Sequence, residues 1–215
     1  MYKLIIDLEF TNYKNKNTKQ NMSEIIEIGG VLLDESNCEV KKIKTYVKPT
    51  QSVINKKIEK LTGITNEMVK DAPVIEDALL NLIKELPDKR NTKLISWSDN
   101  DTKTILSEMK NKSIENKDVE KLCEEFIDLQ DIFNTKINLE RRVSLSNALK
   151  YVDIEFNGKE HDALFDAENT AKLYVAMEDD EEVKNIIHKI SDLFHQEELT
   201  TSLGSMFDFS QFMQD

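Results

Sequence analysis

Two carboxylates within an apolar stretch at the amino terminus constrain the fold of this chain more than any other feature. Residues 4–10 read Leu-Ile-Ile-Asp-Leu-Glu-Phe and contain neither glycine nor proline, which predicts a β-strand. The apolar run is too continuous for an edge strand with one solvent-exposed face, and it favours a central strand covered on both faces. Asp7 and Glu9 are therefore set into the end of a core strand.

Asp7 and Glu9 are two residues apart, so their side chains project from the same face of this strand, roughly 6.5–7 Å apart along the chain. A buried carboxylate without a partner is costly, and a bound cation is the usual remedy. Carboxylate oxygens suit Mg²⁺ and Mn²⁺, so the pair is a candidate metal site. The alternative is that both carboxylates lie on the solvent-exposed face of an edge strand.

The composition describes one globular domain, or one domain with a tail, in 215 residues. Its apolar runs are far shorter than a membrane span, so no membrane partner is expected. The net charge of −12 argues against a protein that coats nucleic acid, but not against an enzyme that holds a few nucleotides through metal ions. Without a secretory segment, and with Cys38 and Cys123 in no metal-type spacing, we expect reduced thiols and a cytoplasmic location.

The order of the predicted elements is that of an α/β protein with one mixed sheet. The first three strands read as an antiparallel meander, with a polar loop over residues 12–21. We expect a globular domain over residues 1–178, followed by an acidic helix and an amphipathic tail over residues 179–215. The predicted strands cover residues 4–11, 24–33, 40–47, 92–97 and 124–129, and the predicted helices cover 53–61, 73–87, a segment after Asp99, 144–152, 163–177 and 182–194.

A third carboxylate is predicted to meet the first strand from the end of the fourth. Asp101 lies just beyond residues 92–97, and the first and fourth strands are expected to be neighbours in the sheet. A carboxylate at the start of the following helix could therefore face Asp7. Asp99 is an alternative ligand, and both aspartates are also what the positive end of a helix favours.

A histidine and a fourth carboxylate lie near a late helix. On a helical wheel Asp166 borders a face with small alanines, which let a helix lie close to a sheet. His161 is off that face, so we expect it in the loop before the helix, over the same spot. Considered alone, His161 fits an ordinary residue at a helix start, and Asp166 a half-buried carboxylate paired with a lysine.

In combination, these stretches resemble the three exonuclease motifs of the DEDDh (DnaQ-like) 3′–5′ exonucleases. The motifs are Asp7-x-Glu9, an aspartate after the fourth strand, and His161-x₄-Asp166, in matching order and on matching elements over about residues 1–178. Three further segments are similar to the Eri/KapD-like branch in particular. They are Glu-Ile-Ile-Glu-Ile-Gly at 24–29, Leu-Thr-Gly-Ile-Thr at 61–65, and the segment 158–171.

The resemblance implies a ribonuclease H-like fold, with a central mixed five-stranded sheet flanked by helices. It also implies a general base, His161, and two Mg²⁺ or Mn²⁺ ions held by Asp7, Glu9, Asp101 and Asp166. Two such ions can stabilise the attacking and leaving oxygens of an in-line displacement at phosphorus, and a histidine can accept a proton near neutral pH.

The function that the resemblance implies is hydrolysis of phosphodiester bonds at single-stranded 3′ ends, with release of nucleoside 5′-monophosphates. RNA is the expected substrate because the Eri-like branch is mainly ribonucleolytic. Phe10 and Thr11 match family positions that line the terminal nucleotide, although Phe10 could instead pack in the core. The alternatives are a DNA proofreading or repair exonuclease of the same fold, and a nuclease-like module that binds nucleic acid or protein without cleavage.

Three positions depart from the family pattern. Asp162 stands where this branch usually has a basic residue, and its charge would weaken the binding of a phosphate group. Phe165 stands where an aspartate is common. The second motif lacks the usual glycine or histidine–asparagine before its aspartate, and we prefer Asp101 to Asp99 because residues 102–106 follow Asp101 in the family manner.

The tail over residues 200–215 lies beyond the resemblance. Met206, Phe209 and Met213 are spaced at i, i+3 and i+7, which gives a short apolar stripe on a helix. We expect the tail either to fold back on the domain or to dock on a protein partner or a second copy of the chain.

Overall fold

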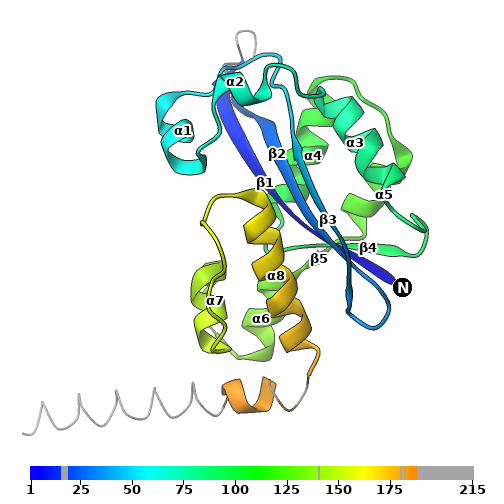
Figure 1. Cartoon of the computed structure of the whole chain (residues 1–215), viewed down its shortest axis with the longest axis vertical. Coiled ribbons are helices and arrows are strands. Elements are labelled where there is room, and N and C mark those ends of the chain that lie inside the picture. The colour runs from blue at the N-terminus through cyan, green and yellow to red at the C-terminus, as the bar shows by residue number, and fades with distance from the viewer. Residues whose placement is uncertain (16–18, 140, 180, 182, 188–215) are drawn as a thin grey trace, which may run out of the picture.

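A five-stranded sheet forms the centre of the computed structural model, which describes residues 1–15, 19–139, 141–179, 181 and 183–187 (Figure 1). The strand order is β3-β2-β1-β4-β5. β1 and β2 pair antiparallel, as do β2 and β3, whereas β4 pairs parallel with both β1 and β5. The strands are β1 (Tyr2–Lys14), β2 (Asn21–Leu33), β3 (Glu39–Tyr46), β4 (Thr92–Ser96) and β5 (Ile127–Asp128). The predicted meander, mixed sheet and pairing of the first and fourth strands are confirmed.

Helices cover both faces of the sheet, so β1 is a central strand buried on both sides (Figure 1). Leu4 and Ile6 belong to the core shared with α3 (Ile75–Lys84), α4 (Asn100–Asn111) and α5 (Lys117–Glu124). Ile5, between them, faces the core of α6 (Leu129–Lys136), α7 (Leu145–Tyr151) and α8 (Ala163–Met177). The two short helices α1 (Lys56–Thr62) and α2 (Asn66–Val69) lie near the end of β1 (Figure 1).

Several predicted boundaries were wrong. β1 continues to Lys14 and β2 begins at Asn21, so residues 12–14 and 21 of the predicted loop belong to the strands of a long hairpin. The predicted strand over residues 124–129 shrinks to the two residues of β5, because α5 precedes it and Asp128 already caps α6. The helices α2, α5 and α6 were not predicted at all.

The carboxyl-terminal segment is described in part. Residues 181 and 183–187 are helical, and Val183 and Ile186 are buried in the core under α8. The remainder of the predicted helix over 182–194 and the tail over 200–215 lie outside the described residues, and the domain boundary at residue 178 stays a prediction. In the part of the chain that the structure describes, every helix is too short or too polar to cross a bilayer.

A close backbone contact determines where α8 begins. Gly29 of β2 is paired with Asp7 of β1, and a Cβ atom at Gly29 would lie 2.1 Å from the carbonyl carbon of Ala163, the first residue of α8. Only glycine leaves room for this approach. The first turns of α8 therefore lie directly beside Asp7.

Candidate active site

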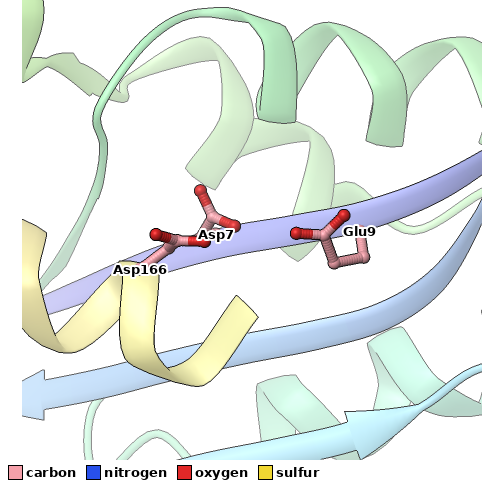
Figure 2. A group of neighbouring side chains, drawn as sticks. All are labelled: Asp7, Glu9 and Asp166. Carbon is pink, nitrogen blue, oxygen red and sulfur yellow. The ribbon is translucent and has the colours of Figure 1, made fainter. Parts of the chain in front are cut away.

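Three carboxylates from two elements converge on the face of β1 that α8 covers. Asp7 and Glu9 project from β1 on the same side as Ile5, and Asp166 projects from the first turn of α8 (Figure 2). Each contributes a carboxylate oxygen to a group whose members all lie within 4.8 Å of one another. The predicted meeting of the first and third motifs is thus observed.

Asp101 reaches the same cleft from the first turn of α4, and only 7% of its surface is exposed. β4 stops pairing with β1 at Ser96, opposite Ile6, and the backbone N–H of Leu8 hydrogen-bonds to the Asp101 carboxylate beyond that point. Asp99 instead forms an ion pair with Lys103 at 2.5 Å. The structure therefore places Asp101, and not Asp99, at the cleft.

His161 lies in the loop before α8, as predicted, and lines the cleft with an exposed side chain. Its backbone has a positive φ of 64°, and its N–H donates a hydrogen bond to Oδ2 of Asp166 at 2.9 Å. Few residues other than glycine adopt this conformation readily, so the hydrogen bond to Asp166 helps to hold it. His161 and Asp166 are thereby fixed relative to each other.

Burial and mutual repulsion raise the pKa of Asp7, Glu9, Asp101 and Asp166. For Glu9, burial followed by the charges of Asp166 and Glu27 raises the pKa to about 8. Burial raises the pKa of Asp101 to about 7 and that of Asp166 to about 6. The pKa of Asp7 is raised well above its ordinary value, mainly by burial and then by Asp101 and Asp166.

The donor set fits a divalent metal ion. Among the described residues, none of the four carboxylates forms an ion pair with a lysine or arginine. The raised pKa values indicate that the cluster lacks positive charge, and carboxylate oxygens are the ligands that hard divalent cations prefer. A bound cation would remove both the repulsion and the cost of burial.

The four carboxylates and His161 line a cleft of about 460 Å³. Phe10 is half-buried at this cleft, as expected for a residue that contacts a nucleotide. Thr11 is fully buried, does not line the cleft, and donates its hydroxyl to the carbonyl of Val53 at 3.4 Å. The Thr11 side chain is thus covered by the segment after β3, and the role of Thr11 in binding the terminal nucleotide stays a prediction.

The negative charge of Asp162 is paired with a lysine of β3. Its carboxylate caps α8 by accepting hydrogen bonds from the N–H groups of Leu164 and Phe165, and lies 2.6 Å from Nζ of Lys44 on β3. The same Nζ lies 3.2 Å from the buried Glu27, which accepts the N–H of Ala163. The negative charge predicted to weaken phosphate binding is thus paired with Lys44 and does not line the cleft, but it still contributes to the raised pKa of Glu9 and Asp166.

Phe165, which stands where the family commonly has an aspartate, packs against a tight turn. Its ring covers Gly158, which has a positive φ of 86°, and a Cβ atom at Gly158 would come within 2.4 Å of that ring. The turn at Gly158 and the ring of Phe165 together shape the loop that carries His161.

Sequence reasoning missed several residues that the fold brings to the cleft. Trp97 was assigned only to the fourth strand and Lys57 only to a short helix, because single positions in short elements carry no motif. An apolar wall surrounds the carboxylates, and it consists of Leu8, Phe10, Ile58, Leu61, Trp97, Leu145 and Phe156. Two signals could have identified part of it: the proximity of Trp97 to Asp101 in the sequence, and the place of Leu61 in the family-like segment 61–65.

Comparisons with known proteins agree with this geometry. The family described as Exonuclease (RNase_T) matches residues 4–174. ERI1 exoribonuclease 2 of Xenopus laevis is 29% identical over 218 residues, which cover 91% of this chain and 31% of that protein. The probable 3′-5′ exonuclease KapD of Bacillus subtilis is 32% identical over 104 residues, which cover 47% of this chain and 50% of that protein.

The fold is also shared with a solved structure. The nuclease domain of 3′hExo, a DEDDh family member bound to rAMP, superposes with a TM-score of 0.72 and 24% identity over 82% of this chain and 90% of that one. The ribonuclease H-like fold is therefore confirmed, as is the resemblance to the DEDDh exonucleases and to their Eri/KapD-like branch. The chain spans about a third of the length of the ERI1 relative. Because the match extends over most of its sequence, the chain belongs to the exonuclease family (RNase_T).

Proposed function

We propose that this protein is a metal-dependent 3′–5′ exonuclease that removes nucleoside 5′-monophosphates from single-stranded 3′ ends, with RNA as its substrate. The observation that carries the proposal is the convergence of four carboxylates and His161 on one cleft in a member of the exonuclease family. A phosphodiesterase needs positive charge near the phosphate and a proton acceptor near the attacking water. This cleft provides residues for both.

The carboxylates of Asp7, Glu9, Asp101 and Asp166 would hold the metal, and we propose two ions, Mg²⁺ or Mn²⁺. Exonucleases of this family generally use divalent metal ions. When bound, the ions supply positive charge that offsets the charge developing on the phosphate oxygens and makes a water easier to deprotonate.

His161 would accept the proton of the attacking water at an imidazole nitrogen. Its side chain is exposed at the cleft, whereas its backbone is held by Asp166, so the imidazole is positioned next to the carboxylates and remains accessible to water. Phe10 would stack on the terminal base, since aromatic side chains stack on any base without strong sequence preference. A cleft of about 460 Å³ is the size of a pocket for one small ligand, which suits a single terminal nucleotide.

Two relatives support RNA as the substrate. One is named an exoribonuclease, and the other nuclease domain was solved with the ribonucleotide rAMP. The cytoplasmic location expected from the two free cysteines stays a prediction.

A digestion experiment tests the function. Single- and double-stranded RNA and DNA of 12 nucleotides, labelled at the 5′ or the 3′ end, are incubated with the protein and Mg²⁺ or Mn²⁺. The proposal expects a ladder from 5′-labelled single-stranded RNA and labelled mononucleotide from the 3′-labelled strand, with Asp166→Asn as the inactive control. Faster digestion of DNA would favour the repair alternative, and binding without any product would favour the non-cleaving module.

A further inference from the structure

A group of lysines on and beside α1 stands out in this acidic protein. Among the described residues that line the cleft, Lys57 is the one lysine, and arginine is absent from that set. Lys56 and Lys60 lie on the same helix, and all three are exposed. Within the described chain, none of the three forms an ion pair, whereas some lysines elsewhere do, such as Lys93 with Glu125 at 2.9 Å.

The geometry of α1 connects these lysines to the cleft. With 3.6 residues per turn, Lys60 and Lys57 lie about 40° and about 100° around the helix from Lys56. Ile58 and Leu61 continue in the same direction and line the cleft with Lys57. Lys57 thus stands at the edge of the cleft, and the other two lysines lead outward from it over the exposed side of the helix.

A fourth cation meets α1 from the loop that carries His161. Nζ of Lys159 lies 3.2 Å from where a Cβ atom of Gly63 would be, directly after the last turn of α1. Gly63 has a positive φ of 84° and ends the helix. The loop before α8 and the end of α1 therefore approach each other at the cleft, and we call Lys56, Lys57, Lys60 and Lys159 the α1 lysine rim.

Two carboxylates lie near the rim without pairing with it. Glu59 is on the side of α1 about 60° from Lys56 and away from the cleft, by the same helical spacing. Glu160 lines the cleft next to His161. The rim therefore keeps an excess of positive charge immediately outside a cleft of strong negative charge. This arrangement would draw an extended polyanion along α1 while only its end enters the metal site.

We propose that the α1 lysine rim binds the phosphates of the single strand behind the terminal nucleotide, so that the strand leaves the cleft over α1. The proposal rests on the proposed function and names the path of its substrate. α1 is about 10 Å long at 1.5 Å per residue, which is enough for about two or three successive phosphates. Phosphate contacts of this kind carry affinity without sequence preference.

The test compares two variants of equal net charge. The rim variant changes Lys56, Lys57, Lys60 and Lys159 to Gln, and the control variant changes four other exposed lysines to Gln. These four, which do not line the cleft, are Lys110, Lys117, Lys172 and Lys184. Binding of a 5′-fluorescein-labelled 12-nucleotide RNA is measured by fluorescence anisotropy in EDTA, between 50 and 200 mM KCl, and melting curves confirm that both variants are folded.

We expect the rim variant to bind at least about fivefold more weakly at 50 mM KCl. Each lost phosphate contact should lower the slope of log affinity against log salt by about 0.7 for a single strand. A rim that holds two or three phosphates therefore predicts a slope smaller by about 1.4–2.1, whereas the control variant keeps the wild-type slope.

Three results would contradict the proposed role of the rim. They are an unchanged salt slope in the rim variant, an equal loss of RNA affinity in the control variant, or absence of RNA binding by the wild-type protein. Binding that depends on the rim, together with no digestion in Mg²⁺ or Mn²⁺, would support the rim and contradict only the proposed catalytic function. The two proposals are therefore separable.

Discussion

Replacing Glu9 by glutamine should stabilise the metal-free protein, and the gain should grow with pH. The pKa of Glu9 is raised from 4.5 to about 8, mainly by burial and then by Asp166, Glu27 and Asp101. An acid whose pKa is higher in the folded state holds its proton more tightly there, so ionisation favours unfolding. The penalty is absent well below pH 4.5, grows as the pH rises between 4.5 and 8, and is constant above that range. Glutamine keeps the shape of the side chain and cannot ionise.

The size of the effect follows from the two pKa values. At about 1.4 kcal/mol per pH unit, the ionisation of Glu9 costs the folded state at most about 5 kcal/mol at high pH. About 1 kcal/mol of this cost is present at pH 5 and about 4 kcal/mol at pH 8. Glu9 titrates together with Asp101 and Asp166, so part of this cost belongs to the cluster as a whole and remains in the variant, and we expect a gain of about 2–4 kcal/mol at pH 8. For a protein of this size each kcal/mol raises the melting temperature by about 2–4 °C.

The assay is thermal melting of the wild type and Glu9→Gln in EDTA at pH 5 and pH 8, followed by calorimetry. The variant should melt about 4–16 °C higher at pH 8 and only a few degrees higher at pH 5. Millimolar Mg²⁺ or Mn²⁺ should then raise the wild-type melting temperature more than that of the variant, because a ligand stabilises the state that binds it. A variant that melts with or below the wild type at pH 8 in EDTA, or a gain independent of pH, would refute the electrostatic account of the cluster.

Three further predictions concern the cleft and its support. Asp7→Ala and Asp166→Ala should each abolish release of mononucleotide from 3′-labelled RNA while the circular dichroism spectrum is retained; near-normal turnover in either would contradict the metal assignment. His161→Ala should slow single-turnover cleavage by about 10²–10⁴-fold while Mn²⁺ still raises the melting temperature, and an unchanged rate would remove His161 as the base. Gly29→Ala should cost about 1–3 kcal/mol in urea unfolding and lower kcat, because its Cβ meets the first turn of α8, whereas Gly30→Ala, with its nearest atom 3.5 Å away, should have a smaller effect on kcat.

The parts of the fold that could be predicted from the sequence are those where one local rule dominates. Continuous apolar residues identified β1 as central, and the spacing of Asp7 and Glu9 placed both on one face, since a strand repeats every two residues. Asp101 and Asp166 then followed from family spacing. The adjacent glycines at 29 and 30 also carried a signal, because glycine inside a strand marks a close approach of another backbone.

Other parts depend on contacts that no local pattern contains. Thr11 lies two residues after Glu9, so strand alternation alone would place both side chains on the same face. Thr11 is nevertheless buried, because the segment around Val53 folds over it. The pairing of Lys44 with Asp162 joins residues that are distant in sequence, so the compensation for Asp162 could not be predicted. Short helices such as α6 were not predicted, because a helix of one or two turns depends on its caps and its packing more than on a repeat of apolar residues in the sequence.

The approach of α8 to Gly29 also determines when the cleft can exist during folding. The hairpins of β1, β2 and β3 join residues close in sequence and can form early, whereas α8 must return to β1 from the opposite end of the described chain. Contacts of such long sequence separation are slow to form, and a chain under synthesis folds its amino-terminal part first. Asp166 and His161 therefore reach Asp7 and Glu9 only when nearly the whole domain has been made and docked. A partly synthesised chain lacks the complete cluster of carboxylates, so the candidate active site is assembled only at the end of folding.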